Sequence, residues 1–142
     1  MLDLTIPGLP LPWKAPYVGS RGAFSPRYAI KKTIQEHLRK TYQGPLIDVA
    51  VRVNMFFFMQ IPKSASKKLV QKMISGEERP TAGGDYTNLR KFYEDCLQEI
   101  VIVNDRQIVE GDGAKLYSFE PRTVILIRPP MPGLSRLASL GE

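Results

Sequence analysis

The chain has 142 residues, which favours a single domain, and its 43% apolar content is enough to bury an ordinary core. Twenty Lys and Arg residues against fourteen Asp and Glu give a formal charge of +6, which suits a polyanionic partner such as nucleic acid or simply a basic soluble protein. The single cysteine, Cys96, excludes an internal disulfide, and the longest apolar run, residues 49–61, is too short and too polar to span a bilayer. We therefore expect a cytoplasmic protein without a membrane partner.

The N-terminal third predicts a strand, a long loop and a helix. Residues 2–7, LDLTIP, alternate as a half-buried strand does and stop at a proline. Residues 7–24 are rich in Pro and Gly and predict a long loop. Residues 25–44 predict a helix with Ser25 as its cap and Pro26 in its first turn.

This predicted helix has an apolar and a basic face, and Gly44 follows its end. Residues at helical spacing form the apolar face: Ile30, Ile34, Leu38 and Thr41. The opposite face carries cations: Arg27, Lys31, Arg39 and Lys40. We expect the lone histidine, His37, to lie at the surface, since no second His or Cys has metal-ligand spacing.

The middle of the chain predicts a central strand and a short basic helix. Residues 47–61 are β-branched and aromatic, and we expect their Phe run, 56–58, in the core, with a base-stacking platform as the alternative. Residues 64–80 predict a short helix with a serine cap and Gly76 after its end. Its Lys67 and Lys68 either face solvent or contact DNA phosphates.

The remainder predicts a helix followed by extended chain. The expected elements are a helix over about 86–99, a strand beginning at 100–103, a turn at 104–106, extended chain over 107–118 and a strand at 123–129. This order predicts an α+β domain, with helices packed on a mixed or antiparallel sheet of about four strands. Residues 1–130 would form the domain, and residues 131–142, rich in Pro, Gly and Ser, a flexible tail.

Residues 84–107 gather five of the fourteen acids in this basic chain. Thr87, Lys91 and Glu94 share one face of the predicted helix, and Asp95 lies at its edge. If the following strand folds back along the helix, Asp105 returns near Asp85. Clustered carboxylates need a cation between them, and Mg²⁺ takes such oxygen ligands, whereas the alternative is a polar helix face with an Arg90–Glu94 ion pair.

The spacing of these residues resembles that of a known family. The pattern consists of Asp85-Tyr86-Thr87-Asn88-Leu89-Arg90-Lys91, then Asp95, then Asn104-Asp105-Arg106-Gln107-Ile108. It is similar to the motif of the RusA family of Holliday junction resolvases, small DNA endonucleases common in phages and prophages. Residues 62–68, 79–81, 115–127 and 23–28 resemble further family segments, so that the resemblance covers most of residues 1–128.

The resemblance implies a Mg²⁺-dependent crossover junction endodeoxyribonuclease, with Mn²⁺ as a substitute metal, acting in DNA recombination and repair in a bacterial or phage-infected cell. By position, Asp85 and Asp105 match metal ligands and Lys91 the catalytic lysine. A four-way junction is two-fold symmetric, so a homodimer is expected. The residues expected to contact DNA are Asn88, Arg27, Lys31, Lys67 and Lys68.

Two positions depart from the family pattern, because Thr87 and Asn104 stand where it has aspartates. We hypothesise that Glu94 replaces the carboxylate missing at position 87, with Thr87 supplying a hydroxyl or orienting a metal-bound water and Asn104 supplying a carbonyl oxygen. The alternative is a catalytically impaired protein that binds branched or single-stranded DNA without cutting it. A structural or regulatory phage protein is the third possibility.

Overall fold

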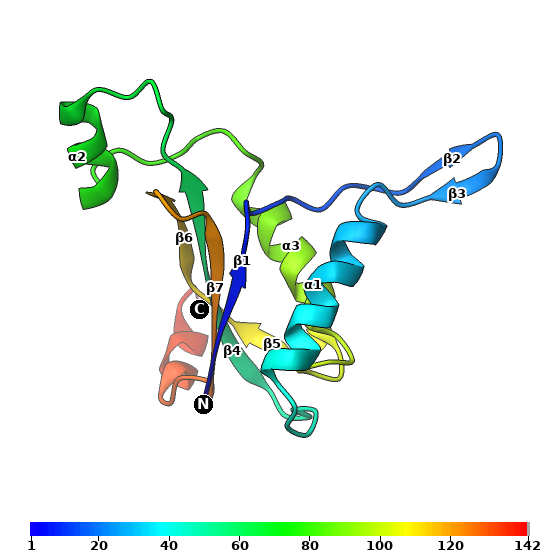
Figure 1. Ribbon diagram of the computed structural model, residues 1–142. Helices are drawn as coiled ribbons and strands as arrows, with labels where there is room; N and C mark the ends of the chain where they lie inside the picture. Colours follow the sequence, from blue (N-terminus) through cyan, green and yellow to red (C-terminus); the bar gives the residue numbers. More distant parts are fainter. Residues whose placement is uncertain (142) are drawn as a thin grey trace.

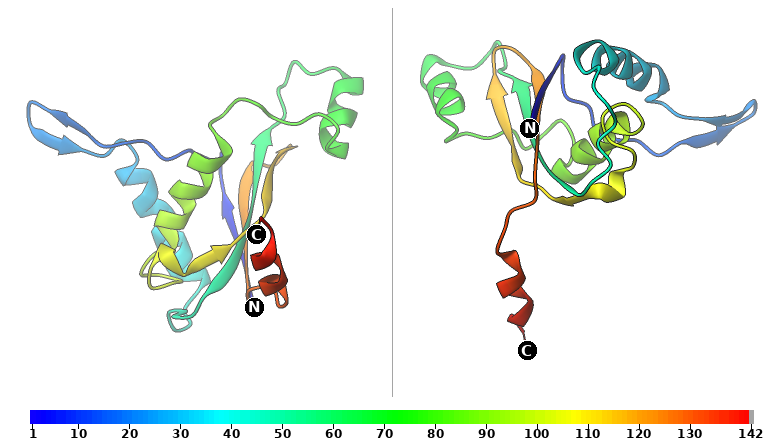
Figure 2. Two further views of the ribbon diagram at one scale, coloured as in Figure 1. Left: turned by 180° about the vertical axis from the view of Figure 1, so that it is seen from behind. Right: turned by 90° about the horizontal axis from the view of Figure 1, so that it is seen from below.

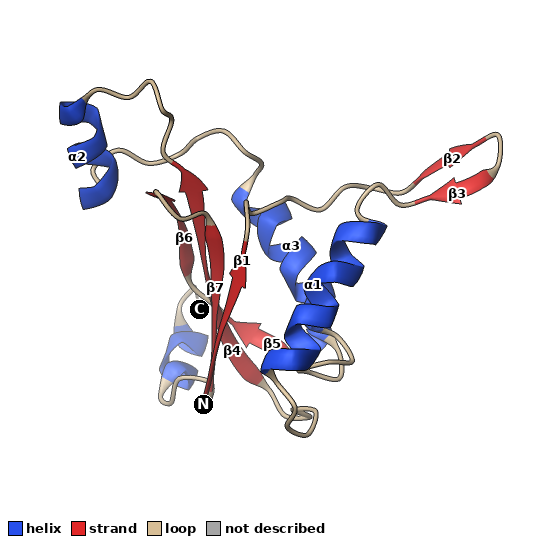
Figure 3. Ribbon diagram, viewed as in Figure 1, coloured by secondary structure: helices blue, strands red, loops and turns tan. Residues whose placement is uncertain are grey.

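The computed structural model describes residues 1–141 and contains a five-stranded mixed sheet with two helices on one face (Figure 1, Figure 3). Three antiparallel neighbours form one side of the sheet: β1 (Leu2–Pro7), β7 (Arg122–Arg128) and β4 (Val51–Gln60). Two shorter strands pair with β4 in parallel: β5 (Ile108–Glu110) and β6 (Gly113–Ser118). The predicted α+β class is confirmed, with five strands in place of about four.

Alternation along β4 sets the two faces of the sheet. Val53, Met55 and Phe57 are fully buried, whereas Phe56 and Phe58, which alternate with them, point to the opposite face and are half-buried. Two helices cover the first face, α1 (Tyr28–Thr41) and α3 (Tyr86–Leu97) (Figure 2). Only the middle phenylalanine of the run therefore belongs to the core.

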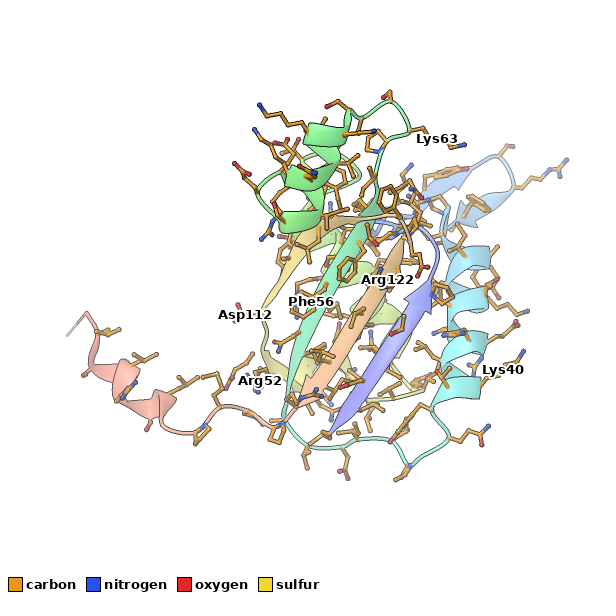
Figure 4. All side chains as sticks on the ribbon, turned by 60° about the vertical axis from the view of Figure 1, so that its left-hand side comes forward. Lys40, Arg52, Phe56, Lys63, Asp112 and Arg122 are labelled. Carbon is orange, nitrogen blue, oxygen red and sulfur yellow. The ribbon has the colours of Figure 1, made fainter. Side chains whose placement is uncertain are left out.

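The second face of the sheet is largely bare. Within the described residues no helix lies over its centre, where Arg52, Phe56 and Arg122 point outward (Figure 4). Paired residues of neighbouring strands share a face, so Val124 and Leu126 of β7 join Phe56 on this side. We call this surface the open sheet face.

The basic helix α2 (Lys67–Ser75) forms where the sequence predicts it. The hydroxyl of Ser66 accepts a hydrogen bond from the Leu69 N–H at 3.2 Å, and Gly76 ends the helix in the left-handed conformation at φ 82°. Met73 is buried, while Lys67 and Lys68 are exposed on a helix that lies beyond the upper end of the sheet (Figure 1).

Three expectations for the N-terminal region are wrong. The predicted loop 7–24 contains a projecting hairpin, β2 (Tyr17–Gly19) and β3 (Gly22–Phe24). Helix α1 begins at Tyr28, so Pro26 precedes it, and the main-chain carbonyl of Ser25, not its hydroxyl, accepts a bond from the Tyr28 N–H. The buried face of α1 is also smaller than its apolar spacing predicts: Ile34 and Leu38 are buried, but Ile30 and Thr41 are exposed. Ile30 lines an open apolar pocket beside residues 7–11 instead.

The expected strand at 100–103 is also wrong. After α3 the chain reverses through Glu99, whose φ is 65°, and Ile102 makes only isolated bridges, to Ile47 and to Gln98. Val101 and Ile102 are fully buried, so their apolar character reflects core filling at the end of α3. A 3-10 turn, η1 (Asp105–Gln107), then leads into β5.

The C-terminal segment projects from the domain (Figure 2). The Met131 N–H donates to both carboxylate oxygens of Glu110, at 3.1 and 3.2 Å, and a short helix follows, η2 (Leu134–Ser139), with exposed side chains. Residue 142, the end of the predicted tail, lies outside the described residues. Across residues 1–141, every helix is too short or too polar to cross a membrane.

Candidate active site

Asp85 stands at the N-cap position of α3, at the end of a glycine approach. Gly83 and Gly84 have φ of 85° and 107°, and a Cβ on Gly84 would lie 2.7 Å from the Pro12 ring. The Lys115 ammonium holds this approach by donating to the carbonyls of Ala82 at 2.9 Å and Gly84 at 2.8 Å. The carboxylate of Asp85 makes no capping bond to the described residues and is exposed, which leaves it available to a ligand.

Lys91 lies six residues, nearly two turns, beyond Asp85 and against the only tryptophan of the chain. Its ammonium is 3.6 Å from the centroid of the Trp13 ring, a cation–π arrangement. The main chain at Trp13 is fixed to the same helix, because its N–H donates to the Asn88 carbonyl at 2.9 Å. Sequence reasoning did not pair Trp13 with the motif, although a lone tryptophan in a Pro-rich loop is a residue that needs a packing partner.

Arg90 has a structural position. Its guanidinium donates to the main-chain carbonyls of Val53 at 3.0 Å and Asp112 at 3.2 Å, and it pairs with Glu94 at 3.4 Å. The ion-pair alternative for this helix face is therefore confirmed for Arg90 and Glu94. Burial raises the pKa of Glu94, the charges of Asp105 and Asp95 raise it further, and Arg90 opposes them.

Asp95 belongs to the same acidic environment. Burial raises the pKa of this carboxyl, Asp105 adds to the rise, and Lys31 and Lys91 oppose it. The Gln98 amide donates to it at 3.3 Å. Since Asp105 influences both α3 carboxyls, the three residues form one electrostatically coupled group, which we call the acidic cluster: Glu94, Asp95 and Asp105.

The η1 turn positions Asp105. The Asn104 side-chain oxygen caps it by accepting from the Arg106 N–H at 3.0 Å, and the side-chain Oε1 of Gln107 accepts from the Asn104 main-chain N–H at 2.8 Å. The Gln107 amide also donates to the carbonyls of Ile47 and Val49, at 2.8 and 2.9 Å. The Asn104 side-chain oxygen is thus already a hydrogen-bond acceptor, and a second role as metal ligand would compete with the cap.

The candidate ligands fall at the two ends of α3. Asp85 and Thr87 are exposed at its beginning, whereas Asp105 lies beside its last turns with the acidic cluster. Ten residues separate Asp85 from Asp95, about 15 Å along a helix axis. The fold-back that would return Asp105 to Asp85 depended on a strand at 100–103, which is absent from the described chain. Among residues 1–141, no three His, Cys, Asp or Glu side chains converge closely enough to hold a metal ion.

The expected DNA-contacting residues differ in availability. Lys67 and Lys68 are exposed on α2. Arg27 uses its Nε to donate to the Pro12 carbonyl at 3.1 Å, and Lys31 is half-buried near Asp95. These last two side chains therefore help to organise the region between α1 and α3, a role that their position on a basic helix face did not suggest.

The protein is a basic α+β domain with carboxylates along one helix and in the turn that follows it. Residues 7–128 match the model of the family described as endodeoxyribonuclease RusA. The chain belongs to this family. It is also 34% identical over 85 residues to the uncharacterized protein YqaN of Bacillus subtilis (strain 168), a match that covers 58% of this chain and 60% of YqaN. The aligned region thus spans less than two thirds of that relative.

Proposed function

We propose that this protein is a Mg²⁺-dependent, structure-specific endonuclease that cleaves Holliday junctions in DNA recombination and repair. The observation that carries the proposal is the family match over residues 7–128, and the acidic cluster on a protein of net charge +6 is consistent with it. Like charges gathered on a cationic protein are costly unless a cation joins them. Membership of an endodeoxyribonuclease family supplies the substrate class, DNA, and the reaction, phosphodiester hydrolysis.

The donor set suits a divalent cation. Asp85 and Asp105 are the proposed ligands, with Glu94 beside Asp105 and the Thr87 hydroxyl beside Asp85. All four offer hard oxygen atoms of the kind that Mg²⁺ or Mn²⁺ prefers. A cation would also relieve the repulsion between Asp105 and Glu94, which contributes to the raised pKa of Glu94. When bound, such an ion polarises the scissile phosphate and activates a water.

Lys91 has the properties of a phosphate-contacting residue. Its ammonium lies over the Trp13 ring, which gives the amine a defined position, and among the described residues it forms no salt bridge. From there it would hold a phosphate oxygen of the bound strand and stabilise charge that develops during cleavage. Lys67 and Lys68 on α2 would contact the backbone elsewhere, without reading base sequence.

A homodimer reconciles the separated ligands with the family pattern. That pattern uses both Asp85 and Asp105, which in one chain lie toward opposite ends of α3. We propose that each cleavage site combines Asp85 of one protomer with Asp105 of its partner. Two-fold symmetry would give two equivalent sites for the two cuts that a junction needs.

Subunit complementation tests this arrangement. Asp85→Asn and Asp105→Asn should each abolish nicking of a labelled synthetic junction in Mg²⁺, while binding persists, because each change removes a negative charge near phosphate. Mixed after co-refolding, the two inactive variants should recover activity. Each mixed dimer would retain one intact site, with Asp85 from the second variant and Asp105 from the first.

Other outcomes separate the alternatives. If single variants are inactive and the mixture stays inactive although mixed dimers form, the ligands act within one chain. A monomer mass by light scattering, both free and on the junction, would refute the dimer. Junction binding in EDTA with no nicking by the unmodified protein in either Mg²⁺ or Mn²⁺ would favour the alternative of a catalytically impaired DNA-binding protein.

A further inference from the structure

The β2–β3 hairpin extends from the domain as a two-stranded arm with its own aromatic pair (Figure 1). Tyr17 and Phe24 are directly opposite each other across the two strands, and their rings meet edge to face with centroids 5.3 Å apart. Every residue of both strands is exposed, and Val18 retains 83% of its accessible surface. An isolated two-stranded hairpin is marginally stable in water, so exposed aromatic rings on it are expected to have a partner.

The charge of the arm and its surroundings indicates the chemistry of that partner. No acidic residue occurs between Asp3 and Glu36, whereas this segment contains five cations: Lys14, Arg21, Arg27, Lys31 and Lys32. Arg21 lies in the turn at the tip, between Gly19 and Gly22. Exposed aromatic rings among cations suit a ligand with aromatic faces and a phosphate backbone, which describes nucleic acid.

The side chains on the arm favour stacking over reading of a groove. Sequence readout in the major groove requires hydrogen-bonding side chains directed at base edges. On this arm one face carries Tyr17 and Phe24, and the other carries Val18 and Ala23. These groups offer little donor or acceptor pattern, but aromatic rings can stack on any base that lacks a stacked neighbour. Such bases occur in single strands and at branch points.

The base of the arm is attached to the helix that carries the family motif. The main-chain N–H of Trp13 donates to the main-chain carbonyl of Asn88, and the Trp13 ring lies under the Lys91 ammonium. On the other side of the hairpin, Arg27 donates to the Pro12 carbonyl at 3.1 Å. DNA held by the arm would therefore be placed in a fixed relation to α3.

We propose that the β2–β3 arm binds DNA at the branch point, where Tyr17 and Phe24 stack on bases that the junction leaves unpaired or that the arm itself unstacks. The proposal rests on the proposed junction-cleaving function. It assigns to the arm the recognition of branched over linear DNA, while the lysines of α2 contribute affinity for any DNA through phosphates.

Fluorescence of 2-aminopurine tests this contact. A synthetic four-way junction would carry the probe beside the branch point, and a linear duplex of the same length would carry it at its centre. Titration in EDTA prevents cleavage. The unmodified protein should change the probe's fluorescence in the junction and leave the duplex probe nearly unchanged.

The double variant Tyr17→Ser and Phe24→Ser should abolish the fluorescence change and weaken junction binding about tenfold or more, as expected when a base loses its stacking partner. Its affinity for the duplex should stay within about twofold. The matched control is Tyr28→Ser, an exposed tyrosine at the start of α1, outside the hairpin. Both variants should keep the thermal midpoint of the parent, since the arm lies outside the hydrophobic core.

The outcomes distinguish the arm from the function it serves. If the double variant binds the junction as tightly as the parent and gives the same fluorescence change, the arm proposal is overturned while cleavage can still be measured. Equal weakening by Tyr28→Ser would overturn it too, because the effect would not belong to the hairpin. A parent protein that gives the fluorescence change but never nicks junctions in Mg²⁺ or Mn²⁺ would overturn the proposed function and support the arm.

Discussion

Replacement of Arg90 by methionine should destabilise the domain, because it removes the hydrogen bonds that join α3 to the sheet. Between the last pair of β4 with β5, Arg52–Glu110, and its first pair with β6, Met55–Gly113, the parallel ladder is interrupted. The Arg90 guanidinium enters this gap from α3 and donates to the carbonyls of Val53 and Asp112. Methionine fills similar volume but donates no hydrogen bond.

The expected cost follows from the hydrogen bonds that methionine cannot make. A hydrogen bond to a charged group contributes about 1.5–3 kcal/mol, and the side chain of Arg90 is only 15% exposed. Water can reach part of this site and replace some of these bonds. The Arg90–Glu94 pair adds about 0.3–0.5 kcal/mol, as is usual for such pairs on helices. We therefore expect the free energy of unfolding to fall by about 3 kcal/mol.

Urea denaturation followed by circular dichroism at pH 7 measures this change. The matched control is Arg39→Met on the exposed side of α1, which should alter the free energy of unfolding by less than about 0.5 kcal/mol. If the free energy of unfolding of Arg90→Met lies within about 0.5 kcal/mol of that of the control, with an unchanged denaturant slope, the guanidinium does not join α3 to the sheet as described. A changed slope would instead mean that the compactness of the denatured or native state has changed, or that unfolding is no longer two-state.

Three further predictions concern the acidic cluster, the turn and the basic helix. Burial raises the pKa of Asp95, so its charged form is disfavoured in the folded state, and Asp95→Asn should raise the thermal midpoint at pH 7. This gain should disappear as the pH falls below the pKa that the Asp95 carboxyl has in the unfolded chain. A thermal midpoint below the parent's at pH 7 would contradict the direction of the pKa shift. Gln107→Glu should lower the free energy of unfolding, measured by urea denaturation, by about 2 kcal/mol, because it replaces an amide that donates to the carbonyls of Ile47 and Val49. Gln107→Met should lower it less, because it adds no charge. Equal stability of the parent and Gln107→Glu would refute the role of these two hydrogen bonds. Changing Lys67 and Lys68 to Ala should make the plot of log affinity against log salt less steep, by roughly 0.9 for each phosphate that the two lysines neutralise, and an unchanged slope would place both lysines away from DNA.

The elements whose signals are local were predicted well. Helix α2 has a serine cap and a terminal glycine, and the structure places both at its ends. The β-branched and aromatic residues of 47–61 likewise predicted β4, although only Phe57 of the expected Phe run belongs to the core. Such features depend on neighbouring residues alone, so a single sequence contains the information.

The failures involve residues whose environment is set by distant parts of the chain. Val101 and Ile102 looked like a strand because they are β-branched, but they are buried at the end of a helix, where burial and not pairing selects apolar residues. The hairpin at 17–24 was concealed by its Pro-rich flanks and small size. For the proposed site, the family resemblance selected Asp85, Lys91 and Asp105 as candidates. The contact of Lys91 with Trp13, however, joins residues 78 positions apart and has no local signal.

Asn104 is the departure from the family pattern that the fold explains most directly. A residue before a 3-10 turn must accept a hydrogen bond from the turn's N–H groups, and Asn and Asp are almost equally suited to this task. Here the Asn104 side-chain oxygen accepts from the Arg106 N–H, and the turn that it caps places Asp105 near Glu94 and Asp95. Asparagine therefore keeps the geometry of an aspartate while it removes one negative charge from a region where Glu94 and Asp95 already repel Asp105. On this reasoning Asn104→Asp should preserve the turn but raise the pKa of both neighbouring carboxyls further. The free energy of unfolding at pH 7 should then fall, and the deficit should shrink as the pH is lowered; a variant more stable than the parent at pH 7 would show that the cap, and not the charge, dominates at this position.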